Sequence, residues 1–180
     1  MSLIHLTAAQ QEELMRAALA EAARGMAEGE APIGSVIARW QGGTPRIVAR
    51  GHNRVNALRR KIAHAEIVTF ENAAADDGTG QPCLPLDAED VILVSTLEPC
   101  VMCLGAAMEA GVRLVLFGLQ APADNGTQRV KPPESPESNA PEIQGSIFPA
   151  ESRRLFETWL RGKEGTDQAK FVQQLLALTD

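Results

Sequence analysis

The sequence predicts a single α/β domain in which a mixed five-stranded sheet lies between two layers of helices. Two short apolar segments, 91–95 and 113–118, are separated by a helical pattern, as in a parallel βαβ unit with a right-handed crossover. Helical and strand patterns alternate along the chain, which is typical of three-layer α/β/α folds. The length of 180 residues fits one domain spanning 1–180.

The first third of the chain predicts one long helix followed by an antiparallel hairpin. Thr7 and Gln10 have the spacing of a capping box, and an apolar stripe then recurs at helical spacing: Leu14, Ala18, Ala22 and Met26. Residues 33–39 and 46–52 have the pattern of two strands around the turn sequence Gln-Gly-Gly-Thr-Pro at 41–45. These strands form the antiparallel part of the expected sheet.

The middle of the chain predicts the parallel strands and their helices. A helical pattern covers 63–75, and the glycine- and proline-rich stretch 76–90 is typical of a loop. The apolar run 91–94 suits a buried strand, and a helix at 99–110 leads to a second one at 113–118. Because ligands bind beyond the carboxyl ends of such strands, we expect the chemistry at the starts of the two helices.

The last third of the chain adds a loop, a strand and two helices. Residues 131–141 are rich in proline and predict a stiff, acidic surface loop. Residues 142–148 are expected to form the last strand, and 150–160 a helix with Leu155, Phe156 and Trp159 on its inner face. The segment 162–180 carries a terminal helix at 167–178.

Composition and charge exclude several classes of protein. Lys and Arg number 17 against 23 Asp and Glu, and the net charge of -6 gives no general attraction to nucleic acids or anionic membranes. The first ten residues do not resemble a signal peptide, and no apolar run approaches the roughly 18 residues of a membrane span. We therefore expect a cytoplasmic protein with no membrane partner.

Two short motifs open the helices where we expect chemistry: His64-Ala65-Glu66 and Pro99-Cys100-Val101-Met102-Cys103. Cys100 and Cys103 are three residues apart in a first helical turn, where the helix dipole favours thiolates. One imidazole and two thiolates are three ligands for tetrahedral Zn²⁺, with the fourth position open to water as in catalytic sites. Glu66 is the candidate acid/base, because a carboxylate beside that water can take up its proton.

These motifs and their neighbours resemble the cytidine deaminase-like superfamily, in the branch of tRNA adenosine deaminases, guanine deaminases and fungal-type cytosine deaminases. The resemblance covers roughly residues 14–118 and rests on five segments: Glu-Ala-Pro-Ile-Gly at 30–34, Gly-His-Asn-Arg at 51–54, His-Ala-Glu-Ile at 64–67, Thr-Leu-Glu-Pro-Cys-Val-Met-Cys-Leu-Gly-Ala at 96–106, and Phe-Gly at 117–118. It implies the cytidine-deaminase-like fold, with two zinc-site helices presenting their N-termini.

The resemblance also implies roles for individual residues. The metal ligands would be His64, Cys100 and Cys103, and Glu66 would carry protons. The Asn53 side chain would hydrogen-bond the substrate ring, and the backbone N–H groups of Ala65 and Cys100 would line the pocket. A homodimer is expected, with Leu104, Met102 and Met108 as core or dimer contacts.

Other interpretations of the cysteines are a redox pair or a non-catalytic zinc module. A redox pair leaves Glu66 unexplained, and a structural zinc site needs a fourth ligand, for which Cys83 is the one remaining cysteine. The loop around Cys83 has no fixed spacing to the Cys-x-x-Cys motif. We therefore favour a catalytic site and interpret Cys83 as a spare loop thiol.

The substrate is the least determined feature. Our first hypothesis is a free aminated base of the guanine or cytosine type, deaminated with release of ammonia; the alternative is a tRNA anticodon adenosine, converted to inosine. Arg59, Arg60 and Lys61 would contact phosphates under the alternative. Aromatic residues make up 4% of the chain and Tyr is absent, although unpaired bases are commonly held by stacking. The loop at 131–141 and the helix after 160 also depart from the short tRNA enzymes.

Overall fold

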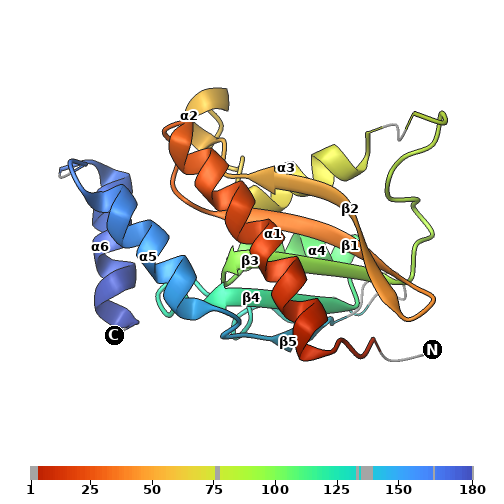
Figure 1. The fold of residues 1–180 in the computed structure, drawn as a ribbon. Helices are drawn as coiled ribbons and strands as arrows, with labels where there is room; N and C mark the ends of the chain where they lie inside the picture. The colour runs from red at the N-terminus through yellow and green to blue at the C-terminus, as the bar shows by residue number, and fades with distance from the viewer. Residues whose placement is uncertain (1–3, 76–77, 133, 135–139, 164, 180) are drawn as a thin grey trace.

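A computed structural model describes residues 4–75, 78–132, 134, 140–163 and 165–179. Its centre is a five-stranded sheet in the order β2-β1-β3-β4-β5, formed by β1 (Gly34–Gln41), β2 (Thr44–His52), β3 (Val91–Leu97), β4 (Leu114–Leu119) and β5 (Glu142–Gln144). The β2, β1 and β3 strands pair antiparallel, whereas β3, β4 and β5 pair parallel. The predicted mixed sheet is therefore confirmed (Figure 1).

Helices cover both faces of the sheet, which confirms the three-layer architecture (Figure 1). On one face lie α1 (Ala8–Ala27) and α5 (Pro149–Leu160), and on the other lie α3 (Ala65–Ala73) and α4 (Val101–Glu109). Each face has its own apolar core. The α1 helix lies so close to the sheet that a Cβ added at Gly34 would stand 2.2 Å from the Ala18 carbonyl oxygen.

The predicted start of the first helix is confirmed in atomic detail. The Thr7 hydroxyl accepts from the Gln10 backbone N–H at 3.3 Å, and the Gln10 side-chain oxygen accepts from the Thr7 N–H at 2.9 Å. These two bonds satisfy groups that a helix end otherwise leaves unpaired. The inner stripe follows the predicted spacing, because Leu14, Ala18 and Ala22 are all buried.

Several predicted boundaries were wrong. The hairpin turn is shorter than 41–45: Gly42 and Gly43 form it with positive φ angles, while Pro45 pairs with Trp40 inside the ladder. The last strand ends at Gln144 and not at 148, because Gly145 packs on a Phe ring and Phe148 adopts a left-handed conformation as the N-cap of α5. Part of the predicted loop at 131–141 lies outside the described residues, namely 133 and 135–139.

The helices near the motifs begin later than predicted. The α3 helix starts at 65 rather than 63 and α4 at 101 rather than 99, and a short helix, α2 (Val55–Leu58), was not predicted. The terminal helix α6 (Asp167–Leu178) is confirmed at its predicted bounds. In α5, Phe156 and Trp159 are buried as expected and pack with α6. None of the helices within the described part of the chain is both long and apolar enough to cross a membrane.

Candidate active site

The two sequence motifs meet where the carboxyl end of β3 approaches the N-termini of α3 and α4. His64 is the N-cap of α3 and Cys100 is the N-cap of α4, both with extended backbone. Cys103 follows in the first turn of α4 and is buried. The predicted positions at helix starts are confirmed, except that His64 and Cys100 are caps rather than helical residues.

Three side-chain atoms from these motifs form a triangle. The Sγ atoms of Cys100 and Cys103 lie 3.6 Å apart, and each lies 3.6 Å from His64 Nδ1. A tetrahedral zinc ion with Zn–S bonds of about 2.3 Å and a Zn–N bond of about 2.05 Å would separate its ligands by about 3.8 Å for S–S and about 3.6 Å for S–N. The residues present therefore fit zinc, and the three atoms could hold it with one position left open.

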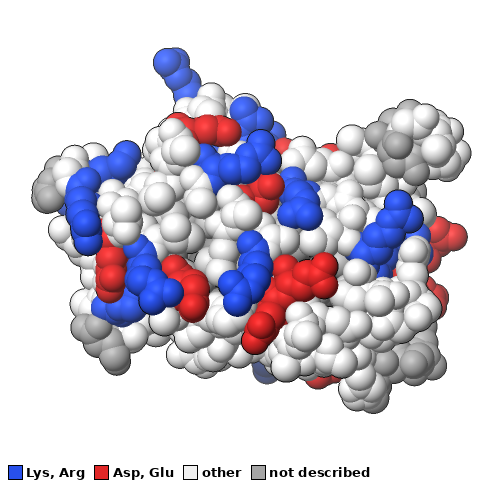
Figure 2. Space-filling model, viewed as in Figure 1, with Lys and Arg blue, Asp and Glu red and all other residues white. Residues whose placement is uncertain are grey.

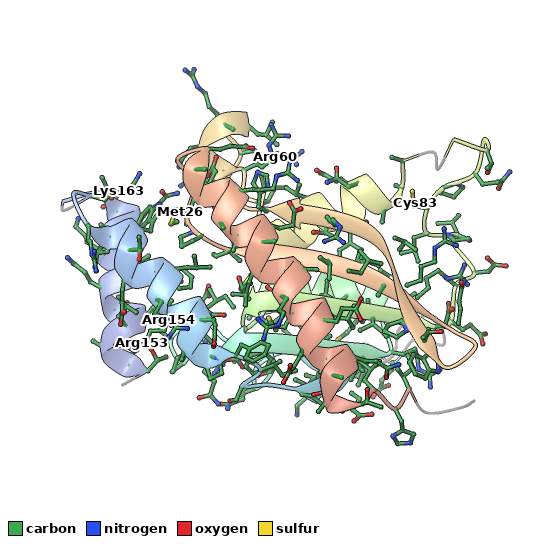
Figure 3. All side chains as sticks on the ribbon, in the orientation of Figure 1. Met26, Arg60, Cys83, Arg153, Arg154 and Lys163 are labelled. Carbon is green, nitrogen blue, oxygen red and sulfur yellow. The ribbon has the colours of Figure 1, made fainter. Side chains whose placement is uncertain are left out.

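Cys83 does not belong to this cluster. It lies in the loop before β3, at the opposite end of the sheet from the carboxyl ends of β3 and β4 (Figure 3). Its backbone N–H is bonded to the Ala75 carbonyl, and its side chain is half-buried. A fourth ligand from Cys83, which a closed structural zinc site would need, is therefore ruled out for this arrangement.

The hydrogen bond between the two cysteines shifts their pKa values in opposite directions. The hydrogen bond between the Sγ atoms of Cys100 and Cys103 lowers the pKa of Cys100 to about 4. The same bond and burial raise the pKa of Cys103. The hydrogen bond with Cys100 raises the pKa of His64. A metal binds cysteine as the thiolate, so metal binding by both sulfurs is coupled to the release of thiol protons.

Glu66 lies beside the triangle in the first turn of α3 and is 3% exposed. The Ser95 hydroxyl, from β3, donates to Glu66 Oε1 at 2.9 Å. Burial raises the pKa of the Glu66 carboxyl above its ordinary value. A buried carboxylate with a raised pKa can take up and release protons nearer to neutral pH than an exposed one.

A cavity of about 380 Å³ opens onto the cluster. Asn53, His64, Glu66 and Cys100 line it, so the structure brings together most of the predicted site residues. Ala65 is buried but is not among the lining residues, and its backbone contact with a substrate stays a prediction. Lys61, predicted as a phosphate contact under the tRNA alternative, also lines the cavity. Sequence reasoning missed lining residues from two other regions: Asp124, and Asp167, Gln168 and Phe171 at the start of α6.

Asp124 reaches the cavity because a buried glutamate holds its loop. Glu98 accepts from the Ala121 N–H at 2.9 Å and from the Thr127 hydroxyl. In the same loop, the Gly126 N–H donates to the Pro99 carbonyl at 2.8 Å. The only sequence signal for this arrangement was Glu98 itself, a charged residue immediately before the cysteine motif.

The basic run before His64 is divided among different contacts. Arg60 pairs with Glu71 at 2.7 Å, while Lys61 lines the cavity and Arg59 is exposed. On the face seen in Figure 2, Lys and Arg side chains are interspersed with Asp and Glu side chains. The run does not act as three free cations, because Arg60 already has an acidic partner.

The fold and the cluster define the class of protein. The His-x-Glu and Pro-Cys-x-x-Cys sequences that form the cluster are the signature of zinc deaminases. Residues 8–119 match the cytidine and deoxycytidylate deaminase zinc-binding region, and the chain belongs to this family.

Two curated relatives both carry names that refer to tRNA. The chain is 40% identical over 105 residues to a tRNA(Ile)-lysidine synthase of Thermus thermophilus, covering 58% of this chain and 18% of the relative. It is 38% identical over 109 residues to the tRNA-specific adenosine deaminase of Bacillus subtilis, covering 61% and 62%. The chain thus spans less than two thirds of the length of these curated relatives.

Similar solved structures include both a tRNA deaminase and a guanine deaminase. A tRNA:A34 deaminase superposes with a TM-score of 0.63 at 31% identity, covering 79% of this chain and 98% of the other. The guanine deaminase of Bacillus subtilis superposes with a TM-score of 0.52 at 26% identity, covering 87% and 97%.

Proposed function

We propose that this protein is a zinc-dependent hydrolytic deaminase in which His64, Cys100 and Cys103 hold the metal. The 3.6 Å spacings of the three ligand atoms support this proposal, as does the family to which the chain belongs. When bound, zinc lowers the pKa of a coordinated water, which makes it a nucleophile at neutral pH.

Glu66 carries the protons in this proposal. It takes a proton from the attacking water and passes it to the ring nitrogen beside the amino-bearing carbon. It then takes the second proton from the oxygen newly bonded to that carbon and gives it to the leaving amine, so that a C=O group remains. A C–O bond forms, the C–N bond breaks, and ammonia leaves. The burial of Glu66 and its bond from Ser95 support this role, because together they hold the carboxyl beside the three ligand atoms.

The substrate that the geometry favours is a small aminated heterocycle of the guanine or cytosine type. The observation that carries this choice is the cavity of about 380 Å³, whose walls include the start of α6. Its volume lies in the range of roughly 300–1,000 Å³ that is usual for small-molecule pockets. Asn53, which is 4% exposed, would hydrogen-bond the ring, with the Ala65 backbone N–H as a second contact.

A tRNA anticodon adenosine is the second candidate, favoured by the names of the relatives at 38% and 31% identity. Such a substrate requires contacts to several phosphates. The Arg60–Glu71 pair argues against a footprint at the basic run, since Arg60 would have to exchange partners. Whether the protein forms the expected homodimer stays a prediction, which light scattering of the purified protein would check.

One assay separates the two substrates. Zinc-loaded protein is offered guanine, cytosine and adenine, with ammonia as the readout, and an anticodon stem-loop RNA, with inosine as the readout. We expect release of ammonia from guanine or cytosine that depends weakly on salt, and no release by Glu66→Gln. Inosine formation that falls steeply with salt, without turnover of any free base, would establish the tRNA reaction instead.

A further inference from the structure

The terminal helix α6 reaches the active-site cavity although it lies outside the family segment 8–119. Its first residues, Asp167 and Gln168, line the cavity together with Phe171 one turn later. Figure 1 shows α6 at the end of the sheet toward which the β3 and β4 arrows point. One wall of the cavity therefore belongs to a helix that the sequence motifs do not include.

Contacts at both ends hold α6 in place. Val172 and Leu175 are buried against Phe156 and Trp159 of α5. The Thr166 side chain caps the helix by accepting from the Ala169 N–H at 3.0 Å. At the other end, an Arg153 guanidinium N–H donates to the Leu176 carbonyl at 3.1 Å. This wall is built into the fold.

A pair of amides joins α6 to α2 beside the cavity. The Asn56 side chain donates to Gln168 Oε1 at 3.3 Å, and the Gln168 side chain donates back to Asn56 Oδ1 at 3.4 Å. The backbone N–H of Asn56 in turn donates to the buried carboxylate of Glu30 at 3.2 Å. The turn of α6 that carries Phe171 is thus tied to the same region of the chain as Asn53.

Phe171 is the one aromatic side chain among the described residues that line the cavity, and it is half-buried. The neighbouring apolar walls are aliphatic: Ala31, Ile33, Val55 and Leu97. A planar heterocycle needs flat apolar contact on its faces and hydrogen bonds at its edge. Among the lining residues, Phe171 has a flat apolar ring and Asn53 has a hydrogen-bonding amide.

We propose that Phe171 is a specificity-determining residue whose ring packs on one face of a planar aminated heterocycle, with the Gln168–Asn56 pair keeping its helical turn at the cavity. The proposal rests on the proposed function for the substrate class. A base that stacks on an aromatic side chain gains binding free energy from that contact, so removal of the side chain weakens binding of the base by roughly 10- to 100-fold.

The test compares zinc-loaded Phe171→Ala and Phe171→Leu with the wild type, using whichever of guanine or cytosine is turned over. We expect KM to rise roughly 10- to 100-fold in Phe171→Ala and by less in Phe171→Leu, while kcat and zinc content stay within about threefold. Binding of the product base, xanthine or uracil, measured by calorimetry, should weaken by the same factor. Leu178→Ala is the control, since this exposed residue lies at the far end of the same helix.

An unchanged KM in Phe171→Ala would overturn the proposal. If the alanine variant loses helical content by circular dichroism, Phe171→Leu decides, because it keeps the apolar volume and loses the aromatic face; wild-type KM in that variant overturns the proposal too. If the wild type converts only RNA, the free-base function fails. The role of Phe171 is then supported by a raised KM for RNA in Phe171→Ala and overturned by an unchanged one.

Discussion

A single methyl group added at Gly126 should both destabilise the protein and disturb the metal site. A Cβ at this position would lie 2.6 Å from the Cys100 carbonyl oxygen and 2.9 Å from that of Pro99. Neither neighbour can yield easily, since both are backbone atoms at the start of α4. The Gly126→Ala loop must therefore move away from the cysteine motif.

The cost follows from two terms. Overpacking a tight site costs about 1–3 kcal/mol, and losing the Gly126 N–H bond to Pro99 costs about 1 kcal/mol more. The sum of about 2–4 kcal/mol should lower the Tm of a protein of this size by about 4–16 °C. Zinc affinity should fall as well, because Cys100 moves with its carbonyl.

The assay is thermal unfolding by circular dichroism with zinc content measured in parallel. Gly105→Ala is the matched control: it lies within α4, and an added Cβ there meets no atom within 4 Å. Replacing a helical glycine by alanine should raise stability by about 0.5–1 kcal/mol. If Gly126→Ala keeps the wild-type Tm and zinc content, the close packing of this loop on the metal site is refuted.

Further variants test the metal and the proton carrier. Cys100→Ala or Cys103→Ala should lower zinc content sharply from about one per chain, whereas Cys83→Ser should leave it unchanged; elemental analysis checks both. Glu66→Gln should keep its zinc but lose roughly 10²- to 10⁴-fold in kcat, and retained turnover would show that another group carries the proton. Without metal, Glu66→Gln should be more stable than the wild type at pH 7. Burial raises the pKa of Glu66, so ionising this carboxyl in the folded protein costs stability once the pH rises above 4.5, the ordinary pKa of the group. The stability advantage of Glu66→Gln over the wild type, measured by urea titration, should therefore vanish below pH 4.5. Asn53→Ala should raise KM and spare the metal, and steady-state kinetics that show only a lower kcat would contradict its role in orienting the ring.

Local rules accounted for much of what the sequence predicted. The capping box at Thr7 depends on residues three positions apart, and the buried strand β3 depends on an uninterrupted apolar run. The spacing of Cys100 and Cys103 places both sulfurs at one helix start. Boundaries were less accurate, because the limits of the hairpin turn and of β5 depend on strand pairing and on a glycine packed against a Phe ring.

The sequence by itself determined the three-layer fold and a histidine, two cysteines and a glutamate as candidates for zinc chemistry, since those features follow from periodicity and short spacings. Only the tertiary structure decided what surrounds them. It placed Cys83 away from the cluster, paired Arg60 with Glu71, and brought α6 to the cavity. The Arg60–Glu71 and Asn56–Gln168 contacts join residues that are 11 and 112 positions apart in the sequence. No local pattern encodes such contacts, because they depend on how packed helices and strands place their side chains in space.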